Sequence, residues 1–219
     1  MGFITKEQIL QVGFKNVGKG VLISEKASVY KPDMISVGDN TRIDDFVVLS
    51  AGDGGIRIGK NVHIAVYSSL IGKGKITVQD FANISSRVSI YSNNDDYSGN
   101  FMTNPTVDKR FSNVEARDVY IGKHVIIGSG SIVLPGVTLE NGVVIGALSL
   151  VKAGIYEKFG IYGGIPVRFL ELNSENVQTE LSFAYMSSSL GKPRLLRRGG
   201  CHFLSSPLRR LAANAEQKI

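Results

Sequence analysis

The sequence predicts an all-β fold in which the chain winds into stacked coils of short, flat strands. The main observation is an aliphatic residue that returns every six positions, six times in succession. These residues are Ile121, Ile127, Val133, Leu139, Ile145 and Val151. A helix has a period of 3.6 residues and a strand a period of 2.0, so neither produces this spacing. A coil of strands of about six residues, each followed by a turn, does produce it.

The same spacing recurs nearer the N-terminus and extends the predicted coil over residues 21–170. The earlier inward positions are Ile23, Val29, Val37, Ile43, Leu49, Ile58, Ile64, Leu70, Val78, Ile84 and Ile90. Together with the C-terminal repeat they form six groups, which predicts about six coils. Residues 1–20 are predicted to be an entry segment that holds a short helix capped by Thr5.

A glycine follows the aliphatic residue in Ile121-Gly122, Ile127-Gly128 and Ile145-Gly146, and a small or apolar residue fills the fifth position of most repeats. This pattern resembles that of the hexapeptide-repeat acyltransferases. The resemblance implies a left-handed parallel β-helix with three strands per coil. It also implies acetyl-CoA as co-substrate, and a homotrimer whose active sites lie between subunits. We expect no metal ion.

The interruption at residues 91–120 is the first feature that the coil does not require. A long loop without periodicity in a compact domain is usually functional or disordered. This loop is rich in aromatic residues, for which we expect burial, among them Tyr97, Phe101 and Phe111. The resemblance implies that the loop projects from the coil, reaches a neighbouring subunit and helps to form the active site.

Asp95 and Asp96 are the candidate catalytic residues of this loop. In many members of the family a histidine at this place is the general base, but here the loop contains none. A hydroxyl needs a base to remove its proton, whereas an ammonium group only has to lose its extra proton, which a nearby carboxylate can accept. The loop therefore favours an amino-sugar acceptor.

The neighbouring Asn93, Asn94 and Tyr97 are the candidate substrate-binding residues. An Asn-Asn-Asp-Asp sequence is also typical of a turn, so a structural role stays open beside the chemical one. Adjacent side chains in an extended segment diverge, so we expect only one of the two carboxylates, Asp95 or Asp96, to face the amine.

Two histidines keep other functions open. His124 lies in the turn of the first repeat after the loop, and His63 lies at the corresponding edge of an earlier coil. Either one, acting as a base, would favour an O-acetyltransferase on a galactoside or a polysaccharide, although both also fit ordinary surface turns. A further alternative is a non-catalytic β-helix scaffold, which would need neither the loop nor the Gly-Ile-Pro sequence at 164–166.

The position of the coenzyme follows from the family and the spacing. Ser129 and Ala147 are 18 positions apart and are predicted to stack on successive coils, with Ile165 18 positions further on. In the family the pantetheine arm follows such a path. The candidate residues along it are Ser129, Gly130, Ala147, Ile165 and Pro166. The candidate phosphate partners are Lys152 and Arg168.

The net charge of +6 is concentrated in the tail. Residues 181–219 hold seven basic residues against one acidic residue, so residues 1–180 are neutral overall and lack a nucleic-acid signature. Residues 171–219 are predicted to be a weakly ordered tail, whose basic part suits weak contact with an acidic membrane surface. The single cysteine, Cys201, excludes an internal disulfide and fits a cytoplasmic location.

The end of the predicted coil strengthens the family resemblance. The stretch from Gly163 to Arg168 resembles the segment that follows the last coil in the family. Within the family, residues 20–170 are most similar to enzymes that acetylate dTDP-4-amino-4,6-dideoxyglucose for the O-antigen of lipopolysaccharide. The predicted function is therefore acetyl transfer from acetyl-CoA to the amino group of a nucleotide-linked amino sugar.

Overall fold

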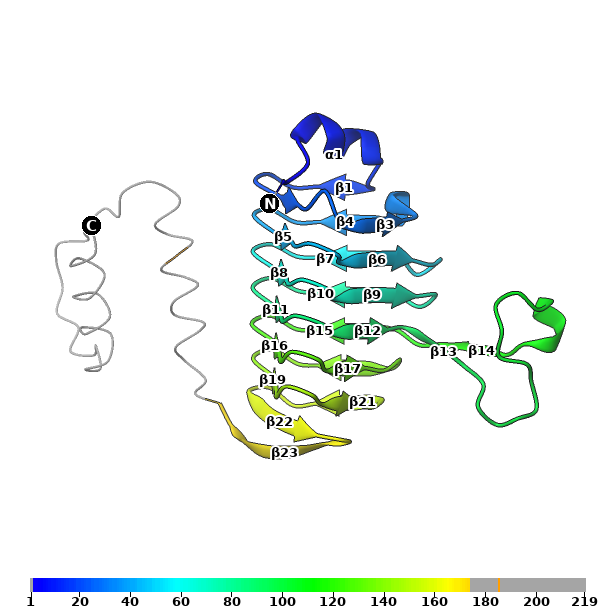
Figure 1. Cartoon of the computed structure of the whole chain (residues 1–219). Coiled ribbons are helices and arrows are strands. Elements are labelled where there is room, and N and C mark those ends of the chain that lie inside the picture. Colours follow the sequence, from blue (N-terminus) through cyan, green and yellow to red (C-terminus); the bar gives the residue numbers. More distant parts are fainter. Residues whose placement is uncertain (1, 174–184, 186–219) are drawn as a thin grey trace, which may run out of the picture. The chain divides into compact units, whose positions relative to one another are not determined.

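The computed structural model describes residues 2–173 and residue 185. Residues 2–173 form a three-sided parallel β-helix, with an α-helix over its N-terminal end and an arm that projects from one edge (Figure 1). The prediction of a weakly ordered, membrane-contacting tail at 171–219 lies almost wholly outside the described residues. No helix among those described is long and apolar enough to cross a membrane.

Three sheets form the three faces of the β-helix, and neighbouring strands within them pair in parallel apart from the last pair, β22 and β23. The seven-stranded sheet consists of β1 (Asn16–Val17), β4 (Ile35–Val37), β7 (Ile56–Ile58), β10 (Ile76–Val78), β15 (Val119–Ile121), β18 (Val137–Leu139) and β21 (Gly154–Tyr156). The eight-stranded sheet consists of β2 (Leu22–Ile23), β5 (Arg42–Ile43), β8 (His63–Ile64), β11 (Asn83–Ile84), β16 (Ile126–Ile127), β19 (Val144–Ile145), β22 (Gly160–Gly164) and β23 (Val167–Leu172). The six-stranded sheet consists of β3 (Ser28–Tyr30), β6 (Val48–Ala51), β9 (Ser69–Gly72), β12 (Ser89–Tyr91), β17 (Ile132–Val133) and β20 (Leu150–Val151).

The core lies inside the three sheets and consists of the aliphatic residues that recur every six positions. Every predicted inward residue is buried except Val29, which is half-buried and packs against the core. Their side chains stack in register from coil to coil, as in the pairs Ile43–Ile64 and Ile84–Ile127. The predicted β-helix is therefore confirmed, and these side chains serve as its scaffold.

The β-helix has seven coils rather than about six, because it extends beyond the aliphatic pattern at both ends. Strand β1 already lies within the predicted entry segment. At the other end, Tyr156 stacks in register on Leu139 and Tyr162 on Ile145. The two tyrosine rings meet edge to face at 5.0 Å and pack against the core. Aromatic residues thus replace aliphatic ones at the end of the coil, which a search for aliphatic spacing misses.

The predicted capped helix is confirmed as α1 (Lys6–Val12). The Thr5 hydroxyl accepts a hydrogen bond from the Gln8 N–H, and the Gln8 side chain accepts one from the Thr5 N–H at 2.7 Å. Ile9 is buried against the first coil. Two short 3-10 helices complete the described elements, η1 (Pro32–Met34) and η2 (Lys109–Phe111).

The arm comprises residues 92–118, which leave the edge between the six-stranded and seven-stranded sheets and return to it (Figure 1). Its stalk is the antiparallel pair β13 (Asn93–Asp95) and β14 (Val114–Ala116). Val78 of the preceding coil pairs with Ile121 after the arm, just as Ile58 pairs with Val78. The arm therefore interrupts the sequence repeat without disturbing the stacking of the coils.

Candidate active site

An open hollow of about 530 Å³ lies on the arm. Its lining is entirely polar or aromatic and consists of Asn94, Asp95, Asp96, Tyr97, Asn113 and Glu115. Three carboxylates therefore surround one space, and only that of Glu115 has an ion-pair partner, Arg117, within the described residues. A hollow of this charge suits a cationic group such as the ammonium of an amino sugar.

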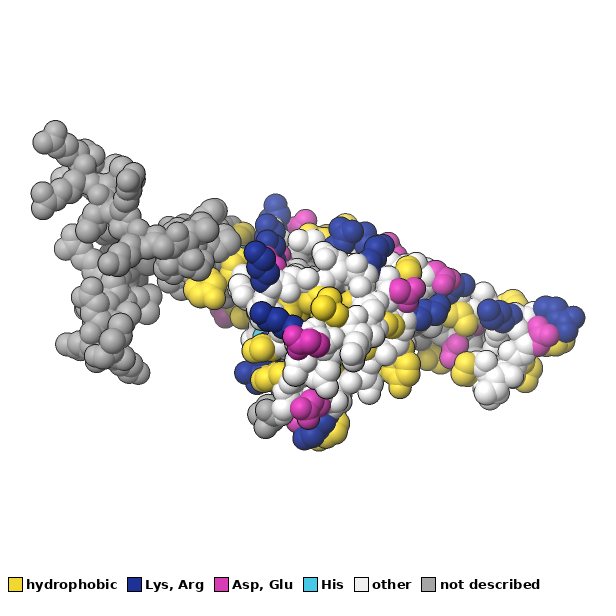
Figure 2. Space-filling model, turned by 90° about the horizontal axis from the view of Figure 1, so that it is seen from above, with side chains coloured by type: hydrophobic (Ala, Val, Ile, Leu, Met, Phe, Trp, Pro, Cys, Tyr) yellow, Lys and Arg dark blue, Asp and Glu magenta, His cyan; other side chains and the backbone are white. Residues whose placement is uncertain are grey.

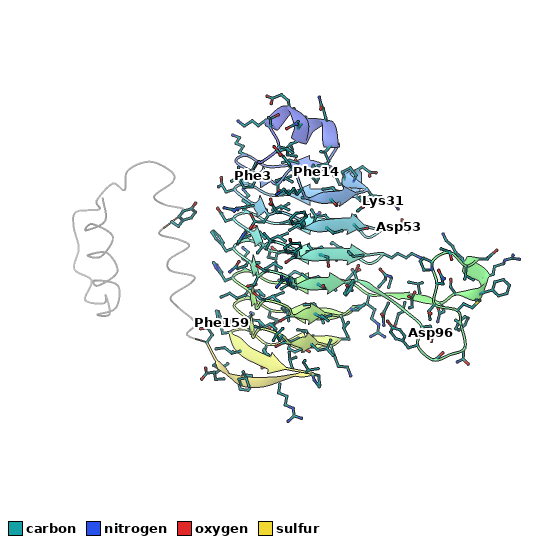
Figure 3. The ribbon with its side chains drawn as sticks, viewed as in Figure 1. Phe3, Phe14, Lys31, Asp53, Asp96 and Phe159 are labelled. Atoms are coloured by element: carbon teal, nitrogen blue, oxygen red, sulfur yellow. The ribbon has the colours of Figure 1, made fainter. Side chains whose placement is uncertain are left out.

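The adjacent carboxylates of Asp95 and Asp96 differ in their hydrogen bonds. Asp96 Oδ1 accepts a hydrogen bond from the Ser98 N–H at 2.7 Å, and Oδ2 accepts one from Asn113 Nδ2 at 2.9 Å (Asp96 is labelled in Figure 3). These bonds from Ser98 and Asn113 lower the pKa of Asp96 below its usual value. Asp96 is therefore ionised at neutral pH and connects the two sides of the arm.

Asp95 has neither a hydrogen bond nor an ion pair on its carboxylate among the described residues. It ends strand β13, opposite Val114 of β14, and it is partly exposed in the wall of the hollow. Asp95 is thus the carboxylate left available for a ligand.

The three predicted substrate-binding residues also separate. Asn94 and Tyr97 line the hollow, and the Tyr97 side chain is 80% exposed. Asn93 is outside the lining, and its Oδ1 accepts a hydrogen bond from the Lys73 N–H of the preceding coil at 3.0 Å. Asn93 therefore anchors the arm to the β-helix.

The aromatic residues of the arm are not buried within one chain, which corrects the expectation from sequence. Tyr97, Phe101, Met102 and Phe111 are each at least 44% exposed. Figure 2 shows hydrophobic side chains among the charged ones on the surface of the arm. They are exposed because the arm extends away from the β-helix, which offers them no surface of the same chain to pack against.

His124 lies at a different edge of the β-helix from the arm. It occupies the turn between β15 and β16, where the seven-stranded and eight-stranded sheets meet, and its φ of 58° is left-handed. Its ring stacks on Phe81 at 5.0 Å, and partial burial lowers its pKa. Within one chain, His124 is therefore not brought together with Asp95.

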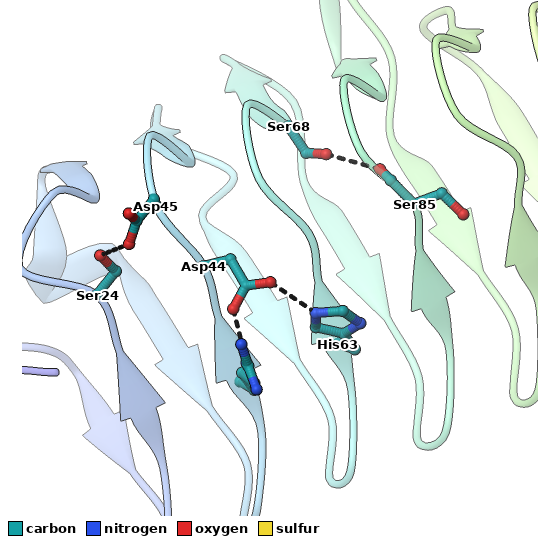
Figure 4. A network of polar contacts seen from close by, with 7 residues as sticks. Ser24, Asp44, Asp45, His63, Ser68 and Ser85 are labelled. Atoms are coloured by element: carbon teal, nitrogen blue, oxygen red, sulfur yellow. Dashed lines mark hydrogen bonds and ion pairs between the residues drawn. The ribbon is translucent and has the colours of Figure 1, made fainter. Parts of the chain in front are cut away.

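His63 belongs to a polar cluster on the eight-stranded sheet (Figure 4). Its Nε2 lies 2.9 Å from Asp44 Oδ2, and Arg42 Nε donates to Asp44 Oδ1 at 2.6 Å. Asp44 is 6% exposed, and burial alone would raise its pKa, but the bonds from His63 and Arg42 outweigh this and lower it. Sequence reasoning missed Asp44, because its partner His63 lies one coil away.

The predicted coenzyme path is only partly assembled in one chain. Ser129 and Ala147 do stack, and the Leu148 N–H donates to the Ser129 carbonyl at 2.9 Å. The next coil is 17 residues long, because Ile145 pairs with Tyr162, so Ile165 lies one residue beyond the position expected above Ala147.

The residues of this path follow the C-terminal ends of strands in the eight-stranded sheet; Ser129, Ala147, Ile165 and Pro166 are exposed, and Gly130 is half-buried. Arg168 lies on β23 of the same sheet. Lys152 lies instead at the edge between the six-stranded and seven-stranded sheets. Within one chain it is therefore not beside the other candidates.

A parallel β-helix with a hexapeptide repeat, interrupted by one polar arm, defines the class of protein. The family described as bacterial transferase hexapeptide (six repeats) matches residues 118–153. A protein of Escherichia coli, dTDP-4-amino-4,6-dideoxy-D-glucose acyltransferase, is 53% identical over 191 residues, which cover 87% of this chain and 98% of that protein. The chain belongs to the hexapeptide-repeat acyltransferases.

The solved structures agree with this assignment. A crystal structure of AntD, an N-acyltransferase from Bacillus cereus, in complex with dTDP and 3-hydroxybutyryl-CoA has a TM-score of 0.80 and 43% identity, and it covers 86% of this chain and 98% of that chain. A second AntD structure, a mutant in complex with dTDP-4-amino-4,6-dideoxyglucose and coenzyme A, has a TM-score of 0.79 and 43% identity, covering 85% and 97%. The putative lipopolysaccharide biosynthesis O-acetyl transferase WbbJ of Escherichia coli K12 is 29% identical over 68% of this chain and 74% of that protein.

Proposed function

We propose that this enzyme transfers an acyl group from a coenzyme A thioester to the amino group of dTDP-4-amino-4,6-dideoxyglucose, in the cytoplasm, for surface polysaccharide synthesis. The observation that carries the proposal is the acidic hollow on the arm, with Asp95 unengaged and no histidine in its lining. The Escherichia coli relative named for this substrate supports the choice of sugar. The AntD complexes with that sugar and with coenzyme A support both substrates.

In the proposed reaction the neutral amine attacks the thioester carbonyl carbon. A carbon–nitrogen bond forms, the carbon–sulfur bond breaks, the attacking nitrogen gives up one proton as it becomes the amide, and the coenzyme leaves as its thiol after taking up one proton. The amine enters mainly as an ammonium ion, which must first lose a proton. Asp95 binds this ammonium ion, accepts the proton and passes it to solvent. Asp96 shapes the arm through Ser98 and Asn113, so its role is positioning.

A spacing in the relatives supports Asp95 further. AntD was crystallised with an aspartate substituted in one structure and a serine substituted in another, and the two residues lie ten positions apart. In this chain the same spacing joins Ser85 to Asp95 and Ser86 to Asp96. Because Asp96 is engaged within the arm, Ser85 and Asp95 are the pair that we assign to the site.

The active enzyme is proposed to be a homotrimer. The exposed aromatic residues of the arm, with Phe101 and Phe111 among them, are the surface that a neighbouring copy would cover. Such an arrangement would carry Asp95 of one copy towards the coenzyme path of the next, along Ser129 and Ala147. Lys152 would then meet the coenzyme phosphates from across the interface, and Arg168 from the same sheet.

A coupled thiol-release assay tests the proposal. The acceptors are dTDP-4-amino-4,6-dideoxyglucose, its 3-amino counterpart and a simple galactoside, each with acetyl-CoA and with 3-hydroxybutyryl-CoA. We expect turnover on the 4-amino sugar that falls sharply in Asp95→Asn. The control is Asp108→Asn, because Asp108 is an arm carboxylate outside the hollow. Equal activity of the two variants would remove Asp95 from the mechanism.

The O-acyltransferase alternative has one observation in its favour. His63 is held by the buried carboxylate of Asp44, an arrangement that can orient a base. Turnover confined to the galactoside, and lost in His63→Gln, would support that alternative against the amino-sugar reaction.

A further inference from the structure

A second, smaller hollow of about 60 Å³ lies on the seven-stranded sheet, and its lining residues come from the first four coils. Its polar lining comes from Lys15, Ser36, Arg57 and Lys75. The strands bring these residues together from far apart in sequence. Lys15 precedes β1, Ser36 and Arg57 pair in register on β4 and β7, and Lys75 precedes β10.

The charge of this hollow is entirely positive. Three cations line it and no carboxylate does. None of the three forms an ion pair with an acid of the described part of the chain, whereas nearby Lys31 pairs with Asp53 at 3.6 Å. Arg57 and Lys75 belong to adjacent coils, whose strands are about 4.8 Å apart, and Lys15 lies two coils before Arg57, so the sheet places three like charges along one hollow. An anion between them would relieve their mutual repulsion.

We propose that this hollow is an anion site that binds a phosphoryl group, most favourably one end of a diphosphate. Arg57 offers a planar fork of donors, Lys15 and Lys75 offer point charges, and Ser36 offers a hydroxyl, which together match phosphate oxygens. The backbone of the Gly54–Gly55 turn is already used, since the Gly54 N–H donates to the Lys73 carbonyl at 2.9 Å. The side chains therefore make the site.

The size of the hollow limits the ligand. It has about a ninth of the volume of the arm hollow, roughly 60 against 530 Å³, so it suits a single small group and not a whole sugar. The remainder of a larger ligand would lie outside on the exposed face of the sheet.

The hollow adjoins the base of the arm. The Lys75 N–H donates to Asp118 Oδ1 at 2.8 Å, and the Lys75 carbonyl accepts from the Val119 N–H at 2.8 Å. Both partners lie where the arm returns to the coil. Lys31 and Asp53 shortly precede two lining residues of the hollow, Met34 and Gly54, in the sequence. Both are labelled in Figure 3 at the edge from which the arm projects. A phosphoryl group bound here would therefore lie beside the root of the arm.

Titration calorimetry at low salt tests the site directly. Inorganic diphosphate, dTDP and coenzyme A are each titrated into the full-length wild-type protein and into the double variant Arg57→Gln/Lys75→Gln. The control is Lys6→Gln/Lys123→Gln, which removes the same charge from positions outside the hollow. We expect diphosphate binding to weaken at least tenfold in the first variant and less than twofold in the second. Equal thermal midpoints would show that both variants are folded.

The three ligands distinguish the source of the phosphoryl group. Loss of dTDP or coenzyme A affinity together with that of diphosphate would place a substrate phosphate in the hollow. Loss of diphosphate affinity alone would place a free anion there. Absence of diphosphate binding to the wild type, or an equal effect of the two double variants, would overturn the proposal. Because binding is measured without turnover, the result is independent of the acyl-transfer proposal.

Discussion

The β-helix and the arm are built in opposite ways. In the β-helix, a repeated aliphatic residue points inward on nearly every strand before the last coil, and its burial stabilises the fold. In the arm, most residues are polar or exposed, and single hydrogen bonds such as that between Asn113 and Asp96 hold its shape. The β-helix is thus the rigid part of the molecule, and we propose that the arm carries the reacting carboxylate, so the two should respond differently to substitution.

The largest expected effect is on the stability of the β-helix. Ile127 is fully buried and stacks between Ile84 and Ile145. Ile127→Ala should lower the free energy of unfolding by about 2–5 kcal/mol, because it leaves a cavity in a closely packed core. The control Ile155→Ala, at a position 74% exposed, should change it by about 0.5 kcal/mol or less. Urea unfolding compares them, and similar midpoints would contradict the assigned core.

The second effect separates chemistry from stability. Asp95→Asn should lower kcat/KM for the amino sugar about 100-fold, the lower range for removal of an acid–base group. The urea midpoint should stay unchanged, because no side chain of the described chain bonds to the Asp95 carboxylate. Steady-state kinetics and urea unfolding on the same preparations measure both. A loss of stability that matched the loss of activity would contradict the division between coil and arm.

These two regions also differ in how well their sequence predicts them. The position of Ile127 follows from spacing alone, because each inward residue is fixed by the one six positions before it. The roles of Asp95 and Asp96 do not follow, because both are acidic, adjacent and in the same loop. Only the folded arm, which brings Asn113 to Asp96, distinguishes them.

Contacts between coils are the other part that sequence leaves open. Tyr162 replaces an aliphatic residue in the core, and it becomes recognisable only through its pairing with Ile145. Lys15, Arg57 and Lys75 line one hollow because the strands beside them pair in register from coil to coil, as Ser36 does with Arg57. Such contacts depend on register, and register is set by pairing that a single sequence does not display.

The third effect concerns a polar contact within the β-helix. Asp44→Asn should lower stability at pH 7 by about 1–3 kcal/mol, because the buried carboxylate accepts bonds from Arg42 and His63. The folded pKa of Asp44 is lowered, so its stabilisation is present above the unfolded value near 3.9 and is lost as pH falls through the folded pKa. Urea midpoints at pH 7 and pH 3 should therefore differ less for the variant than for the wild type. An equal pH response would contradict this role.

The smallest effect should come from the equivalent contact in the arm. Asp96→Asn removes the charge that Ser98 and Asn113 stabilise, and the lowered pKa of Asp96 means that this charge persists to a lower pH than that of an ordinary aspartate. We expect kcat/KM to fall less than tenfold, with KM changing more than kcat, because the hollow loses its shape while Asp95 remains. Asn113→Ala, which removes the partner and keeps the charge, should reproduce the change in KM. If Asp96→Asn instead abolished turnover while Asn113→Ala did not, Asp96 would be the reacting carboxylate. The roles that we assign to Asp95 and Asp96 would then be exchanged.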